Sequence, residues 1–288
     1  MWNLFRAWQR KRKSTWRKLP VLVLVNGLAE QAESWYCNRL DWQRDFDVKV
    51  PEILVYDGTQ LQQRIAQGLP ITVPYLTDCL EEYLDRFVQK PPYFLVASSL
   101  GCQIAVELAV RRPAWVKRMV LLCPSGFGGS ERLPVVEGVR HNDPEALVRS
   151  IFYDPRYVDQ EILRCLRQRM QQREWKKGVL RTVRGTTQHS VRDQLPKVAC
   201  PTLVICGAED QIVCPREVHE AIRDLPQFHY VLLPKCGHAP QIERSKLVNR
   251  LVRSFLLSSE AYQPANNAAP EPALVSWSPQ VELGHAVG

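Results

Sequence analysis

The chain has 288 residues, of which 45% are hydrophobic and 24% charged, a composition typical of a soluble globular protein with one large core. Seven lysines and arginines and no acid fall in residues 1–19, so the net charge of +8 belongs largely to a terminal segment and does not indicate a nucleic-acid partner. Because no run of about 18 apolar residues occurs and no apolar stretch follows the basic N-terminus, we expect neither a membrane-spanning helix nor a secretory signal peptide.

The two ends of the chain differ in composition from the rest. Residues 1–19 form a basic arm rich in tryptophan and arginine, which is either an anchor for weak contact with a membrane surface or an anionic partner, or a solvated arm or edge hairpin. We favour the second interpretation of the arm. Residues 259–288 are rich in proline, alanine and asparagine, which predicts a disordered tail.

The nine cysteines contain no C-x-x-C pair, and several of them lie in apolar strand-like runs, as Cys123 and Cys206 do. Their odd number also argues against complete pairing. This pattern predicts reduced, mostly buried thiols in a cytoplasmic protein, and neither a disulfide framework nor a zinc site.

Short apolar runs that end in turn residues recur along the chain. The first, 21–25, reads VLVLV and is followed by Asn-Gly, as expected for a strand buried on both faces of a parallel sheet. Further strands are predicted at 46–53, 93–97, 118–123, 202–206 and 229–233. Helical patterns are found at 75–88, 100–110, 215–225 and 246–257. This alternation predicts an α/β fold with a mostly parallel, doubly wound sheet.

Residues 126–192 interrupt the alternation because they contain no strand-like run. Helical spacing predicts helices at 144–152 and 159–175 instead. We therefore expect a helical cap over 126–192, inserted between the fourth and fifth of these strands. The core would then be formed by residues 20–125 and 193–258.

A candidate nucleophile, Ser99, lies between a predicted strand and a predicted buried helix. An attacking serine on a sharp strand-to-helix turn needs small residues two positions before and after it, and Ala97 and Gly101 meet that demand. The helix that begins at Leu100 directs its first N–H groups at the same place, where an oxyanion would form. Serine is also a common helix N-cap, so the motif alone is a weak signal.

A candidate acid and a candidate base follow two later strands. Asp210 comes just after the strand at 202–206, although a turn aspartate in a G-x-x-D loop would look the same. Its neighbour Glu209 is expected to face solvent. Of the six histidines, His238 alone follows the last strand on a loop of small residues. The resulting order of serine, aspartate and histidine is the order that a nucleophile on this kind of turn requires.

The loop after the first strand is the expected source of a second oxyanion donor. It begins with Asn26-Gly27, and we assign the backbone N–H of Leu28 as that donor, paired with the N–H of Leu100.

At these residues the sequence resembles the α/β-hydrolase superfamily, in particular its capped branch of esterases, meta-cleavage-product C–C hydrolases, haloalkane dehalogenases and epoxide hydrolases. The resemblance covers residues 20–258, and CGAEDQIV, CGHAPQIE and RMVLLCPSG are similar to the acid loop, the histidine loop and the strand that leads into the cap. It implies an α/β-hydrolase fold and hydrolysis through an acyl-enzyme without metal or cofactor. Because Ser99 stands where dehalogenases and epoxide hydrolases have a carboxylate, those two activities are not expected.

Three positions depart from the pattern of that superfamily. Asn26 replaces the usual histidine of the oxyanion loop, and Ala97 and Cys102 replace glycines near the nucleophile. The glycine-rich pattern usual after Asp57-Gly58 is missing, so residues 58–74 are an unusual segment near the expected pocket entrance.

Three functions are compatible with these residues. The first is hydrolysis of a carboxylic ester or thioester of a small or medium acyl substrate. The second is C–C bond hydrolysis of the meta-cleavage type, which needs cations in the pocket to bind a substrate carboxylate. The cap offers several such cations, among them Arg140, Arg149, Arg181 and Arg184. The third is a non-catalytic binding role on the same fold.

Overall fold

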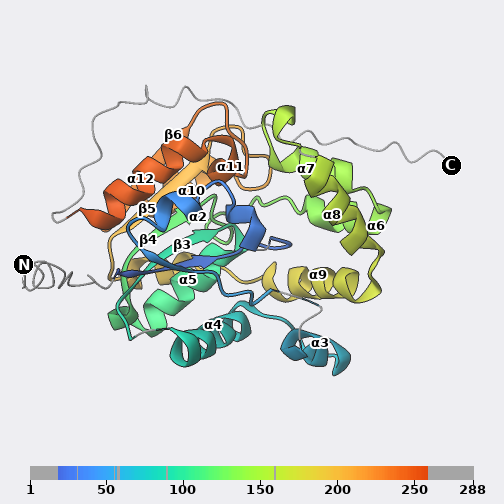
Figure 1. Ribbon diagram of the computed structural model, residues 1–288, viewed down its shortest axis with the longest axis horizontal. Coiled ribbons are helices and arrows are strands. Elements are labelled where there is room, and N and C mark those ends of the chain that lie inside the picture. The colour runs from blue at the N-terminus through green and yellow to red at the C-terminus, as the bar shows by residue number, and fades with distance from the viewer. Residues whose placement is uncertain are drawn as a thin grey trace, which may run out of the picture.

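The computed structural model describes residues 19–258, apart from residues 31, 55, 57, 58, 89 and 159 (Figure 1). The predictions for the basic arm, for the tail at 259–288 and for the Asp57-Gly58 turn therefore concern residues outside the described part. In the part that is described, none of the helices combines the length and the apolar character needed to cross a bilayer.

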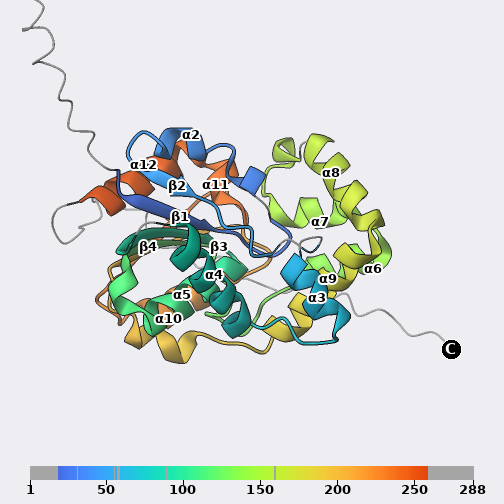
Figure 2. The same ribbon diagram turned by 60° about the horizontal axis from the view of Figure 1, so that its bottom comes forward.

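Six parallel strands form one sheet in the order β2-β1-β3-β4-β5-β6. Their bounds are β1 Val21–Val25, β2 Asp47–Lys49, β3 Tyr93–Ser98, β4 Val116–Leu122, β5 Thr202–Gly207 and β6 Phe228–Leu233. The predicted α/β fold with a parallel sheet is confirmed. The inner strands are continuous apolar runs because helices cover both faces of the sheet, as the two views in Figures 1 and 2 show.

Alternate residues of each strand enter two separate cores. Val21, Val23 and Val25 of β1 pack on one face, and Leu22 and Leu24 pack on the other. The first face is covered by α4 Val73–Phe87, α5 Leu100–Arg111 and α10 Pro215–Ile222. The second is covered by α2 Arg39–Trp42 and α12 Ser245–Leu257. The helix α11 Pro240–Glu243 precedes α12.

The strand predicted at 46–53 is shorter than expected, because β2 ends at Lys49. It is an edge strand paired only with β1 among the described residues, and its three residues are partly exposed. Pro51 follows closely and has no N–H to continue a ladder. Phe46 still packs into the core, where its ring lies 5.6 Å from that of Phe94.

Helices α6 Pro134–His141, α7 Pro144–Ile151, α8 Gln160–Gln171 and α9 Arg173–Thr186 lie between β4 and β5 in the chain. They gather on one side of the molecule, beyond one end of the sheet (Figures 1 and 2). The single helix predicted at 159–175 is thus two helices, separated at Gln172, whose backbone is extended. Helix α8 contributes Leu163 to a small apolar cluster and Met170 to the main core, and α9 contributes Val179 to the main core.

The four helices α6 to α9 lie in the segment predicted as a cap and are called the cap below. The unusual segment before α4 packs directly against one of them, α9. Helix α3 Thr59–Ala66 lies beside α9 in both views. A Cβ on Gly178 would lie 2.1 Å from Tyr56, and one on Gly185 would lie 2.0 Å from the carbonyl oxygen of Ile71. These contacts require glycine at both positions, so Tyr56, Ile71 and α3 pack closely against α9.

Candidate active site

Ser99 occupies a strained turn between β3 and α5. Its backbone angles are φ 50° and ψ −119°, a conformation that is costly for a residue with a side chain. The Ser99 N–H donates to the carbonyl oxygen of Leu122 at 3.0 Å, which ties the turn to the neighbouring strand β4. A Cβ on Gly101 would lie only 2.4 Å from the carbonyl oxygen of Val25, so the first turn of α5 presses against β1.

Replacing Gly101 by alanine is expected to destabilise the fold by about 3 kcal/mol or more, because the added methyl meets backbone that cannot rotate away. Thermal and urea unfolding would measure this loss. The matched control is Gly129→Ala, since a Cβ there has no atom within 4 Å. Equal stabilities of the two variants would contradict the close approach of α5 to β1.

Asp210 and His238 form a buried pair in which Nδ1 of the imidazole lies 2.8 Å from Oδ2 of the carboxylate. Their exposed fractions are 2% and 7%. The other oxygen, Oδ1, accepts the N–H groups of Ile212 at 2.8 Å and Val213 at 3.1 Å, which fixes the carboxylate. The backbone N–H of His238 donates to the carbonyl oxygen of Ile151 at 2.7 Å, so the histidine loop is also tied to the end of α7.

The electrostatics of the pair favour a charged imidazole. Burial opposes the charge of His238, but the charge and hydrogen bond of Asp210 outweigh burial and raise the pKa of His238 above its ordinary value. Two further carboxylates, Glu30 and Glu131, act on the same ring. Burial raises the pKa of each of them, and the charge of His238 opposes that rise.

Among the described residues, no hydrogen bond directly joins the Ser99 hydroxyl to the imidazole of His238. Such bonds in hydrolases commonly close only in the Michaelis complex. The turn that carries Ser99 follows β3, and Asp210 and His238 follow β5 and β6. All three residues therefore lie at the carboxyl edge of one parallel sheet, where open α/β sheets bind their ligands.

Leu28 and Leu100 lie on two turns that meet at Ser99. The turn after β1 is closed by the Glu30 N–H, which donates to the Gly27 carbonyl oxygen at 3.3 Å. A Cβ on Gly27 would lie 3.0 Å from Cβ of Ser99, which shows how closely the two turns approach. Within the described part of the chain, no protein group accepts the N–H of Leu28 or Leu100.

The structure gives hydrogen-bond partners to Asn26 and Glu209, two residues near the site. Asn26, in place of a histidine, accepts the indole N–H of Trp35 at 2.7 Å in the core and so anchors the loop after β1. Glu209, expected to face solvent, is only partly exposed. Its carboxylate accepts the N–H of Cys236 at 2.9 Å, because the acid loop and the histidine loop pack side by side.

Glu243 links the cap to the histidine loop and was not singled out from the sequence. Its Oε1 accepts the N–H of Gly237 at 2.7 Å, and its Oε2 accepts those of Tyr153 at 3.0 Å and Asp154 at 3.1 Å. Burial raises the pKa of Glu243, and these three hydrogen bonds oppose the rise. One carboxylate therefore holds the residue before His238 against the chain that leaves α7.

Replacing Glu243 by glutamine is expected to destabilise the protein by about 1.5–3 kcal/mol, because the amide NH₂ faces buried N–H donors that lose their acceptor. Thermal unfolding is the measurement. Glu220→Gln, on the exposed face of α10, is the control and should behave as wild type. A Glu243→Gln variant with unchanged melting temperature would rule out this link.

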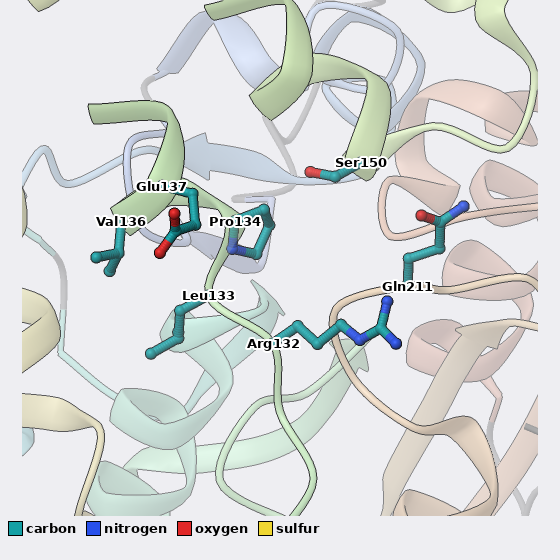
Figure 3. A pocket seen from close by; sticks show the side chains of 7 residues that line it. All are labelled: Arg132, Leu133, Pro134, Val136, Glu137, Ser150 and Gln211. Atoms are coloured by element: carbon teal, nitrogen blue, oxygen red, sulfur yellow. The ribbon is translucent and has the colours of Figure 1, made fainter. Parts of the chain in front are cut away.

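A cavity of about 420 Å³ lies between the cap and the acid loop (Figure 3). Neither Ser99 nor His238 lines it, but Gln211 directly follows Asp210 and Ser150 directly precedes Ile151. The cavity thus lies beside the acid loop but is not lined by the Asp210–His238 pair itself. Its lining residues are Arg132, Leu133, Pro134, Val136, Glu137, Ser150 and Gln211.

Cys123, at the end of β4, lies next to the acid–base pair. The potential metal-ligand atoms of three side chains, those of Cys123, Asp210 and His238, lie within 4.8 Å of one another. In the described part of the chain, this is the group of side chains that could hold a metal ion. Burial raises the pKa of the Cys123 thiol well above its ordinary value, which disfavours the thiolate that a metal needs. All nine cysteines are free thiols, as predicted.

Comparison with known proteins identifies the family of the chain. Residues 22–251 match the model of the alpha/beta hydrolase family. The monoacylglycerol lipase abhd6-B of Xenopus laevis is 24% identical over 194 residues, which are 60% of this chain and 57% of that protein, so the chain spans little more than half of this relative.

Solved structures resemble the fold over most of its length. A putative lipase (lip1) from Acinetobacter baumannii AYE has a TM-score of 0.70 and 23% identity, covering 84% of each chain. The 2-hydroxy-6-oxo-6-phenylhexa-2,4-dienoate hydrolase of Rhodococcus sp. strain RHA1 has a TM-score of 0.70 and 20% identity, covering 83% of this chain and 91% of that one.

Proposed function

Because the chain belongs to the alpha/beta hydrolase family, we propose that it is a serine hydrolase that cleaves carboxylic esters or thioesters of small to medium acyl substrates. The observation that carries the proposal is the buried Asp210–His238 pair at the edge of the sheet where the strained turn presents Ser99. The named activity of the Xenopus relative, a monoacylglycerol lipase, supports an ester substrate.

In the proposed reaction His238 takes the proton of the Ser99 hydroxyl, and the oxygen attacks the substrate carbonyl. The N–H groups of Leu28 and Leu100 stabilise the resulting oxyanion, a contribution of about 2.7–4 kcal/mol for each donor. Asp210 keeps Nδ1 protonated and stabilises the imidazolium, which then protonates the leaving group. A water molecule activated by His238 releases the acid and restores Ser99.

The test is hydrolysis of p-nitrophenyl esters with acyl chains from acetyl to dodecanoyl, together with covalent labelling by a fluorophosphonate. We expect turnover with a chain-length optimum that reports the depth of the pocket, and labelling of one serine. A folded protein that neither hydrolyses these esters nor takes the label would contradict the proposal and favour a non-catalytic binding role.

C–C bond hydrolysis of the meta-cleavage type is the second candidate. The observation that favours it is the guanidinium of Arg132 in the cavity, which is the kind of group that binds a substrate carboxylate (Figure 3). The cap arginines named from the sequence do not line this cavity. Turnover of a 2-hydroxy-6-oxo-dienoate that exceeds turnover of every ester would favour this activity.

A further inference from the structure

Glu30 is a partly buried carboxylate beside the nucleophile, and the mechanism above leaves it without a role. Its Oε2 accepts the N–H of Gly27 at 2.6 Å, and its Oε1 accepts the hydroxyl of Ser98 at 3.0 Å. Ser98 is fully buried at the end of β3, next to Ser99. One carboxylate therefore joins the turn after β1 to the turn that carries the nucleophile.

Gly27 lies at the centre of this junction. A Cβ on Gly27 would be 3.0 Å from Cβ of Ser99, 3.1 Å from the carboxyl carbon of Glu30 and 3.1 Å from the carbonyl oxygen of Ser98. The two turns are thus in contact, with no room for a side chain between them. Their relative position depends on this contact and on the two hydrogen bonds of Glu30.

The two turns each carry one of the proposed oxyanion donors. Leu28 directly follows Gly27, and Leu100 directly follows Ser99. Oxyanion donors work only when they lie about 2.7–3.1 Å from the developing charge, and a shift of about 1 Å in such a site can cost about 100-fold in rate. Whatever sets the spacing of the two turns therefore sets the strength of the oxyanion hole.

Holding a carboxylate here has a cost, because burial raises the pKa of Glu30, while the bonds from Gly27 and Ser98 and the charge of His238 oppose the rise. Apolar side chains in place of Glu30 and Ser98 would fill the same space without the cost of desolvating a charge. They would make no hydrogen bonds, however, and so would not fix the relative position of the two turns. We propose that Glu30 is a positioning residue that sets the distance between the two halves of the oxyanion hole. This inference rests on the proposed esterase function.

The experiment compares Glu30→Ala, Glu30→Gln and wild type by steady-state ester hydrolysis and by inhibition with an aryl trifluoromethyl ketone, which forms a hemiketal oxyanion on the nucleophile. For Glu30→Ala we expect kcat to fall about 10- to 100-fold with KM within about twofold of wild type, and the inhibition constant to rise by the same factor. Glu30→Gln should recover much of this loss, because its amide oxygen accepts from Gly27 and its NH₂ donates to Ser98.

Glu33→Ala, an exposed acid three residues further on, is the matched control and should match wild type. If Glu30→Ala does not fold, Ser98→Ala removes one of the two bonds and should show a smaller parallel change in kcat and inhibition constant. A kcat within about twofold of wild type, or a lower kcat with an unchanged inhibition constant, would overturn the positioning role. An inactive wild type would instead overturn the esterase function itself and this inference with it.

Discussion

The Ser99→Ala variant is expected to lose about 10⁶-fold in kcat for its best p-nitrophenyl ester and to take no fluorophosphonate label. Removing the nucleophile of a serine hydrolase abolishes the acyl-enzyme route, and what remains comes from binding and from the oxyanion donors. The fold should be retained, because alanine removes a single hydroxyl and leaves the backbone bond from residue 99 to Leu122 in place. Discontinuous hydrolysis assays at high enzyme concentration would measure the residual kcat. Intact-protein mass spectrometry would measure the label.

Ser150→Ala is the matched control for this experiment, since Ser150 lines the cavity beneath the cap. It should be labelled and should turn over ester within about tenfold of wild type. If Ser99→Ala still took the label while Ser150→Ala did not, Ser150 and not Ser99 would be the nucleophile.

The Asp210→Asn variant is expected to lose about 10⁴-fold in kcat, which corresponds to about 5 kcal/mol of transition-state stabilisation. Asparagine preserves the shape of the side chain but donates an NH₂ or presents a neutral oxygen to Nδ1. The imidazole then loses both the preferred tautomer and the charge that stabilises its protonated form. Residual activity should therefore be measured across a pH series as well as at one pH.

The pH dependence follows from the direction of the His238 pKa. A general base must be neutral, so kcat/KM rises with pH through the pKa of His238. In wild type that pKa is raised, because Asp210 outweighs burial. In the variant the charge that most strongly raises this pKa is gone, while burial, which lowers it, remains, so the acid limb of the Asp210→Asn profile should move to lower pH.

Glu209→Gln separates the acid of the pair from its neighbour. Glu209 accepts an N–H of the histidine loop but does not touch the imidazole, so its loss should leave kcat within about tenfold of wild type and the acid limb unmoved. An unshifted limb in Asp210→Asn, with a shifted one in Glu209→Gln, would reverse the assignment of the acid.

The local sequence pattern was sufficient to predict most strands of the sheet. The apolar run at 21–25 predicts β1 to the residue, because a central parallel strand is buried on both faces and needs no partner to be recognised. The length of the edge strand β2 was overestimated, because the position where it ends depends on its pairing with β1 and on Pro51. The predicted helix at 159–175 missed the break at Gln172, because no proline or glycine marks that position in the sequence.

The sequence by itself determined the family and the parallel sheet, and it led to Ser99, Asp210 and His238 as the proposed catalytic residues, since each of these inferences depends on residues close together in the chain. Only the tertiary structure decided the hydrogen-bond partners of Glu30 and Glu243. Each accepts hydrogen bonds from a distant segment, Glu30 from a residue 68 positions away and Glu243 from one 90 positions away. A carboxylate among polar neighbours has no periodicity that marks it. Its function arises only when folding removes water and leaves particular N–H and O–H groups as its partners.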